Sequence, residues 1–211
     1  EGYSLQLTAD HRVRRVSMLS RWQMHSEWCA AGELRAGDQV VLNDHRQGAA
    51  WSGRYGQDEG YLLGLLIGDG TFAEERAVLS TWRAASAMHG TTAVDGVMRA
   101  VEQAACCLTH HSDFAGWHVI AESNEWRWRS TALRDLAATL DIGPGNKAIT
   151  PEAERTSSEF HRGLLRGLFD ADGSVQGSQA NGLSVRLAQS DVSLLQAAQR
   201  MLLRLGIGSV I

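Results

Sequence analysis

Two short stretches of the chain combine leucines with evenly spaced glycines, and each ends in an aspartate followed by a glycine. The first, residues 62–70, has the sequence LLGLLIGDG, and the second, residues 165–173, has the sequence LRGLFDADG. In the first, Gly64 and Gly68 share one face of a helix because they lie four positions apart. A glycine face carries no Cβ atoms, so a second helix can approach it closely. The pattern therefore predicts two helices packed side by side.

Side-by-side packing would bring the terminal acids of the two stretches, Asp69 and Asp172, together at one end of the helix pair. Two carboxylates at such close range repel each other unless a divalent cation or a shared proton lies between them. We therefore predict a metal site at a two-fold-like interface. Either stretch alone is also typical of a buried helix that ends in a glycine cap, but the repeated Asp-Gly register favours the paired interpretation.

The segments after the first stretch alternate between strand and helix patterns. Residues 76–83 form a predicted strand, and residues 125–129 alternate tryptophan with arginine, so that the two residue types point to opposite faces. Helical patterns cover residues 97–105 and 132–140. From Tyr61 onward we therefore predict the order helix, strand, strand, helix, strand, strand, helix.

The second stretch starts the same series again at Phe160. A strand is predicted over residues 183–189, a helix capped by Asp191 follows, and residues 206–211 begin another strand. Fewer residues follow Asp172 than the first series needs for its later strands and last helix. We therefore expect an α+β fold with two pseudo-symmetric repeats, the second incomplete, in a chain that is a fragment of a longer protein.

The first part of the chain has a different character. Residues 1–43 are predicted as a small all-β segment because short alternating runs are separated by polar turns. Residues 44–58 are a polar, glycine-containing linker, and we place a domain boundary there. The two repeats would then occupy residues 59–158 and 159–211.

Composition narrows the possible functions. A net charge of −4 excludes a nucleic-acid binder whose whole surface is basic, so DNA binding requires positive charge on one face. The 3 cysteines form no C-x-x-C pair, and the longest apolar run is too short to span a membrane. We expect a cytoplasmic location, where thiols stay reduced.

A zinc site is a weak alternative, because adjacent ligands on a helix point about 100° apart. Its candidate ligands would be Cys106, Cys107, His110 and His111.

The paired motifs resemble those of LAGLIDADG homing endonucleases, also called the DOD type. The resemblance implies two αββαββα repeats around the motif helices, with β-sheets that form a saddle over duplex DNA, in a monomer with internal pseudo-two-fold symmetry. It also implies that Asp69 and Asp172 bind Mg²⁺ and that the activity is a site-specific double-strand break. The segment Lys147–Pro151, which contains the chain's only lysine, resembles the family's block near the cleavage centre.

In this hypothesis the carbonyl groups of Gly68 and Ala171 would join the two acids as oxygen ligands, which hard cations prefer. Lys147 would hold or activate water, or offset charge in the transition state. The alternative is a surface lysine that caps the preceding helix. Arginines on polar sheet faces are candidates for contacts with bases or phosphates, although each could simply be a solvated side chain. These candidates are Arg76, Arg83, Arg127, Arg129 and Arg186.

The first 43 residues resemble the splicing (Hint) domain of an intein. Thr8 and His11 match its T-x-x-H block, and residues 33–38, with sequence ELRAGD, match the segment that follows. Turn chemistry alone also explains a polar pair at positions 8 and 11. The order of a splicing half followed by an endonuclease is that of a large intein. The sequence of the first block resembles inteins hosted in bacterial ribonucleotide reductases. Host-protein exteins would then be partners of the precursor.

Two other functions stay open at this point. The chain could be a DNA-binding module of the same fold that no longer cuts, which the net negative charge favours. It could instead be part of a self-processing element that acts on peptide bonds, with its terminal splicing residues outside this chain, since position 1 is Glu and position 211 is Ile.

Overall fold

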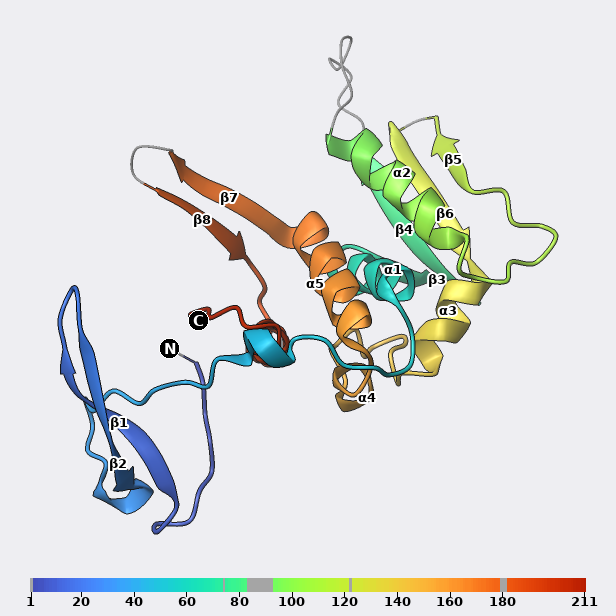
Figure 1. Ribbon diagram of the computed structural model, residues 1–211. Helices are drawn as coiled ribbons and strands as arrows, with labels where there is room; N and C mark the ends of the chain where they lie inside the picture. The colour runs from blue at the N-terminus through green and yellow to red at the C-terminus, as the bar shows by residue number, and fades with distance from the viewer. Residues whose placement is uncertain (1, 74, 83–92, 122, 179–181) are drawn as a thin grey trace.

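Two helices lie side by side at the centre of the molecule, α1 (Gln57–Gly68) and α5 (Ser158–Asp172) (Figure 1). The computed structural model describes residues 2–73, 75–82, 93–121, 123–178 and 182–211. Helix α5 begins where the sequence offers a cap, because the Ser157 hydroxyl accepts the Phe160 amide at 3.0 Å.

The glycine faces of α1 and α5 meet directly. A Cβ at Gly64 would lie 2.8 Å from the amide nitrogen of Leu168, and a Cβ at Gly167 would lie 2.8 Å from the amide nitrogen of Leu65. A side chain at either position would overlap with the backbone of the opposite helix. The close helix pair predicted from the glycine spacing is therefore confirmed, and its contacts are reciprocal.

The first half of the molecule continues from α1 in the predicted order. Its elements are β3 (Thr71–Ala73), β4 (Arg76–Trp82), α2 (Ala93–Ala105), β5 (Trp117–Ile120), β6 (Glu125–Ser130) and α3 (Thr131–Ala138). The strands form one antiparallel sheet with the order β3-β4-β6-β5. Helix α3 starts at a serine cap, since the Ser130 hydroxyl accepts the Leu133 amide at 3.0 Å. The α+β fold class is confirmed.

The two faces of this sheet differ, as the alternation in residues 125–129 predicts. Trp128 is fully buried, and its cross-strand neighbour Trp117 donates its indole N–H to the Met98 carbonyl of α2 at 3.2 Å. Strand periodicity places Arg127 and Arg129 on the opposite face. Helix α2 therefore covers the tryptophan face, while the arginine face lies open.

The second half is smaller. Strands β7 (Gly173–Ser178) and β8 (Gly182–Leu187) form a two-stranded antiparallel hairpin on the other side of the helix pair, followed by α6 (Val192–Arg204) (Figure 1). The Asp191 cap is confirmed, because its carboxylate accepts the Ser193 amide at 2.8 Å.

The strand predicted over residues 206–211 does not form. Gly206 adopts a φ of +83° and ends α6, and the Ile207 amide then donates to the Leu202 carbonyl at 2.9 Å. The apolar run after the glycine therefore follows a helix cap, and the described residues place no neighbouring strand beside it.

The N-terminal segment forms only part of the predicted all-β unit. Strands β1 (Arg12–Leu19) and β2 (Met24–Ala30) pair as an antiparallel hairpin, and a 3₁₀ turn at Ala31–Glu33 follows. Outside this hairpin the all-β expectation fails: residues 3–7 and 37–42 form no strand, apart from one isolated bridge between Arg15 and Val40. A strand needs alternating polarity and also a neighbouring strand to bond its backbone groups. The alternating sequence does not provide that neighbour.

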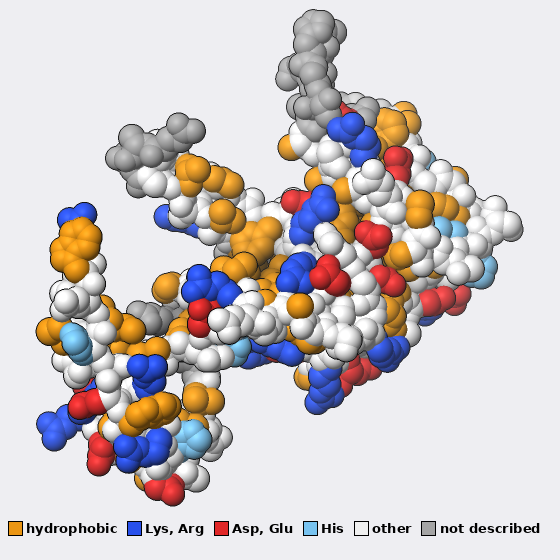
Figure 2. Space-filling model, viewed as in Figure 1, with side chains coloured by type: hydrophobic (Ala, Val, Ile, Leu, Met, Phe, Trp, Pro, Cys, Tyr) orange, Lys and Arg blue, Asp and Glu red, His pale blue; other side chains and the backbone are white. Residues whose placement is uncertain are grey.

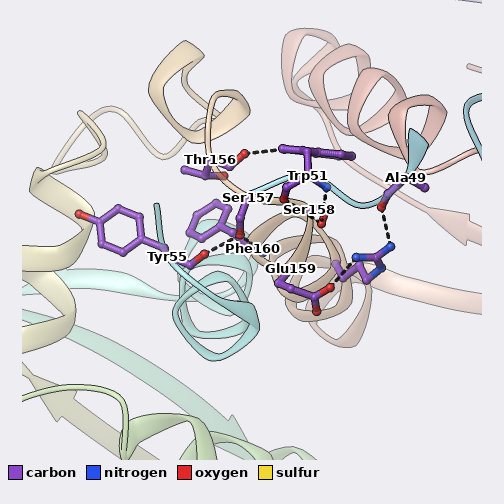
Figure 3. A network of polar contacts seen from close by, with 9 residues as sticks. Ala49, Trp51, Tyr55, Thr156, Ser157, Ser158, Glu159 and Phe160 are labelled. Carbon is purple, nitrogen blue, oxygen red and sulfur yellow. Dashed lines mark hydrogen bonds and ion pairs between the residues drawn. The ribbon is translucent and has the colours of Figure 1, made fainter. Parts of the chain in front are cut away.

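The predicted linker is tied to the start of α5 (Figure 3). The Trp51 indole donates to the Thr156 carbonyl at 2.8 Å, and the Ser157 hydroxyl donates to the Tyr55 carbonyl at 2.5 Å. A 3₁₀ turn at His45–Gly48 precedes these contacts. The linker therefore fixes how the chain enters the helix pair, while the domain boundary placed there stays a prediction.

None of the described helices combines the length and apolar character that a membrane span requires.

Candidate functional site

The carboxyl ends of α1 and α5 meet at one end of the helix pair. Asp69 follows the last turn of α1 as its C-cap, and Asp172 is the last residue of α5. A Cβ at Gly68 would lie 3.0 Å from Asp172 Oδ2 and 2.5 Å from the Cβ of Ala171. The structure thus brings together the two acids and the two neighbouring residues that the sequence singled out.

Lys147 reaches this point from the loop between α3 and α4 (Pro151–Glu154). Its Nζ donates to the carbonyl oxygens of Gly68 at 3.1 Å and Gly70 at 2.5 Å. Gly68 is the last residue of α1 and Gly70 lies two positions beyond it, so neither carbonyl has an acceptor role within the helix. The lysine is half-buried beside both acids, so it caps α1 rather than the helix that precedes it in sequence.

The loop that carries Lys147 is anchored on both sides. The Thr150 hydroxyl donates to the Leu140 carbonyl at 2.6 Å and accepts the Ala153 amide at 3.2 Å, which makes it the cap of α4. Pro151 occupies the first position of that helix, where its missing N–H costs nothing. The proline of the KAITP segment therefore fixes the loop that presents the lysine.

The electrostatics of the three charged groups are coupled. Burial raises the pKa of Asp172, and the negative charge of Asp69 raises it further, while Gln189 and Lys147 oppose this shift. Burial lowers the pKa of Lys147, and the charges of Asp69 and Asp172 act in the opposite direction. Two acids and one ammonium group in partial burial leave an excess of one negative charge at the helix ends.

Gln189 was not predicted as a site residue. Its side-chain amide, which follows the end of β8, donates to Asp172 Oδ2. The hydrogen bond favours the ionised carboxylate and holds one of its oxygens in place. The available signal was a polar residue at the end of the strand expected over residues 183–189, but nothing in its spacing connects it to Asp172.

The donor set at the helix ends fits a hard divalent cation. Two carboxylates and nearby backbone carbonyls are the oxygen ligands that Mg²⁺ prefers, and a cation would relieve the repulsion that raises the Asp172 pKa. The Gly68 carbonyl also accepts the lysine, which leaves one of its two lone pairs for a further contact.

Among the described residues, no three or more His, Cys, Asp or Glu side chains gather in a way that could hold a metal ion. The weak zinc alternative is therefore not supported. His110 stacks on Phe114 with ring centroids 3.7 Å apart, and Cys106 donates to the Glu102 carbonyl at 3.5 Å.

The candidate DNA-contacting arginines have different surroundings. Arg76 pairs with Asp113 at 2.7 Å, and Arg127 pairs with Glu125 at 2.6 Å. Arg129 is exposed and makes no hydrogen bond or ion pair with any described residue. Two further candidates remain: Arg186 lies on the exposed β8 and donates to Ser184 at 3.2 Å, and Arg83 lies outside the described residues.

Thr8 and His11 form a turn before β1. The His11 amide donates to the Thr8 carbonyl at 3.1 Å, and the Thr8 side chain bonds Asp10, which lowers the pKa of that carboxyl. Both residues are exposed. This is the polar turn that turn chemistry predicts, and a role in splicing stays a prediction.

Comparisons with known proteins bear on both halves of the chain. Residues 159–211 match the model of the LAGLIDADG-like domain. Over 224 residues the chain is 23% identical to the ribonucleoside-diphosphate reductase NrdEB subunit alpha of Bacillus subtilis (strain 168), and equally to the corresponding subunit of Bacillus phage SPbeta. The match covers 100% of this chain and 19% of each relative, so the chain spans about a fifth of their length.

Proposed function

We propose that this chain is the endonuclease of an intein, which makes a site-specific double-strand break in duplex DNA by metal-dependent phosphodiester hydrolysis. One observation carries the proposal: Asp69 and Asp172 meet at the ends of two glycine-faced helices, beside the only lysine of the chain. The match of residues 159–211 to the LAGLIDADG-like domain supports it, because that segment contains the second acid.

Asp69 and Asp172, with the carbonyl groups of Gly68 and Ala171, would hold Mg²⁺. When bound, such a cation supplies Lewis acidity and lowers the pKa of water. The protein's own groups do the rest. Gln189 keeps one oxygen of Asp172 fixed through its hydrogen bond. Lys147 places a positive charge next to both carboxylates, where it can stabilise negative charge that develops on a phosphate.

The open sheet face would contact the DNA. It carries Arg127 and Arg129 and lies opposite the face covered by α2. The polar face of the β7–β8 hairpin, with Arg186, would contribute from the other side of the helix pair. Because the total charge is −4, binding depends on these local arginines rather than on the field of the whole protein.

The proposed intein context rests on the first 43 residues and on the reductase relatives. The alignment covers the whole of this chain but only about a fifth of the reductase subunit. This is what a segment inserted in such a host protein would give. Thr8 and His11 would then belong to the splicing block.

A DNA-binding module that does not cut is the second candidate. It is favoured by the unequal sheets, because the second half presents two described strands where the first presents four. The retention of both acids and of Lys147 at one point argues against it, since binding alone does not require crowded carboxylates.

Cleavage of a supercoiled plasmid that carries the uninterrupted host gene separates these functions. We expect nicked and linear products with Mg²⁺ and none with EDTA, and Asp172→Asn should reduce the rate at least about a hundredfold. The matched control is Asp170→Asn on the same helix, whose carboxylate instead accepts the Tyr61 hydroxyl at 3.0 Å. Full activity of Asp172→Asn would exclude the proposed site, and duplex binding without cleavage in the unsubstituted chain would favour the binding module.

A further inference from the structure

Strand β6 holds an arginine and a glutamate in a geometry that Arg76, Arg129 and Arg186, the other described candidate arginines, do not share. Arg127 Nε donates to Glu125 Oε1 at 2.6 Å, and Arg127 Nη2 donates to Glu125 Oε2 at 2.8 Å. Two parallel bonds of this kind fix the plane of the guanidinium group. Both residues lie on the open sheet face, two positions apart on one strand.

Glu125 is itself held in place. Only 7% of the residue is exposed, and the hydroxyl groups of Ser80 and Ser123 add hydrogen bonds to its carboxylate. The pKa of Glu125 is lowered chiefly by Arg127, so the carboxylate is ionised at neutral pH. The arginine therefore rests on a rigid acceptor rather than on a mobile surface acid.

The pair leaves a defined part of Arg127 unused. A guanidinium group has five N–H donors, and Glu125 takes one from Nε and one from Nη2. The remaining donors lie on Nη1 and on the outer side of Nη2, at the end of the side chain. That end presents two parallel N–H groups, which is the arrangement that binds O6 and N7 of guanine in the major groove.

Arg127 and Arg129 differ in how much of their positive charge is neutralised by a neighbouring acid. Arg127 with Glu125 has no net charge, so the pair gains little from a phosphate and offers directional hydrogen bonds instead. Arg129 lies two positions further along the same face and has no partner among the described residues, so its full charge is available to a phosphate. One strand thus carries two arginines suited to different contacts.

We propose that Arg127, oriented by Glu125, reads a guanine base in the DNA target, and that Glu125 is a positioning residue for this contact. The inference rests on the proposed function, because it assumes that the open sheet face binds duplex DNA. It adds that specificity at one base pair depends on a neutral ion pair, whereas Arg129 contributes affinity without base preference.

The test is selection of preferred duplexes from a random pool by the 211-residue chain, in EDTA to prevent cleavage, followed by binding to the selected duplex and its single-base variants. At one guanine, replacement of the base should weaken binding by the unsubstituted chain about tenfold to a hundredfold. Arg127→Ala and Arg127→Lys should both lose discrimination at that base pair alone. Glu125→Gln should reduce the discrimination because an amide presents only one acceptor to the fork.

Arg129→Ala is the matched control. It should weaken binding equally for all duplexes and reduce the slope of log affinity against log salt concentration by about one. Arg127→Lys keeps the charge and should leave that slope unchanged. Circular dichroism of each variant checks that a change in binding does not come from a folding defect.

Each result has one meaning. If Arg127→Lys and Arg127→Ala keep the base preference of the unsubstituted chain, or if Arg127→Ala behaves like Arg129→Ala, the inference is wrong while the proposed function stands. If the unsubstituted chain enriches no duplex at all, the proposed DNA target and the inference both fall.

Discussion

The two halves of the molecule share one helix interface but differ in what surrounds it. Around α1, four strands are covered by α2, and Trp128 is fully buried. Around α5, two strands stand without such a cover, and Val175 and Val185 are 67% and 66% exposed. Figure 2 shows hydrophobic side chains at the surface of this hairpin. The reciprocal glycine contacts hold the two helices in equivalent positions in spite of this difference. Symmetry therefore resides in backbone contact at the interface and not in the sheets.

The two acids also differ, although their helices are equivalent. Asp172 is partly buried and accepts Gln189, whereas the exposed Asp69 side chain accepts no hydrogen bond from any residue in the described part of the chain. Burial raises the pKa of Asp172. The two carboxylates would therefore contribute unequally to a shared cation, with Asp172 the more constrained of the two.

The largest expected effect tests the symmetry of the interface. Gly64→Ala and Gly167→Ala should each lower the free energy of unfolding by about 1–3 kcal/mol, and by similar amounts, because either Cβ overlaps with the opposite backbone. Gly96→Ala in α2 is the control, since a Cβ there meets nothing within 4 Å and should stabilise by about 0.5–1 kcal/mol. Denaturant unfolding measures all three. A large cost at one of the two interface positions and none at the other would contradict the reciprocal packing.

A smaller effect tests whether the surroundings of Asp172 differ from those of Asp69. The pKa of Asp172 is raised in the folded chain, so the unsubstituted protein loses stability as the pH rises above the unfolded value of about 3.9. Without divalent cations, Asp172→Asn should therefore gain up to about 1 kcal/mol at pH 7, since an amide still accepts Gln189 and repels no carboxylate. The gain should vanish near pH 3, where the carboxyl group is protonated.

Asp69→Asn provides the comparison, because the exposed Asp69 has less burial to relieve and should gain less at pH 7. Unfolding free energies at pH 3 and pH 7 for both variants give the result. Equal gains would show that the two acids have equivalent surroundings, and a loss of stability in Asp172→Asn at pH 7 would contradict the raised pKa of Asp172.

The sequence was most informative where backbone geometry leaves no choice. Glycines four positions apart predict a close helix pair, since few other residues allow it, and the Asp-Gly register then places Asp69 and Asp172 together. Lys147 was found because it is the only lysine, although its bonds to the Gly68 and Gly70 carbonyls were not foreseen.

Contacts that depend on the partner of a side chain could not be read from spacing. Gln189 reaches Asp172 only because β8 ends beside α5, and Arg127 differs from Arg129 in its surroundings because Glu125 lies within reach. The strands expected near the N-terminus failed for a related reason, because a pattern of polar and apolar residues does not specify a neighbouring strand.

The central claim is that Asp69 and Asp172 share a divalent cation, and its most direct test is the melting temperature as a function of Mg²⁺ concentration at constant ionic strength. A cation that binds only the folded chain should raise the melting temperature of the unsubstituted protein and of Asp170→Asn. It should leave Asp69→Asn and Asp172→Asn nearly unchanged. A melting temperature that does not respond to Mg²⁺ in the unsubstituted protein, or that responds equally in all four chains, would contradict the account.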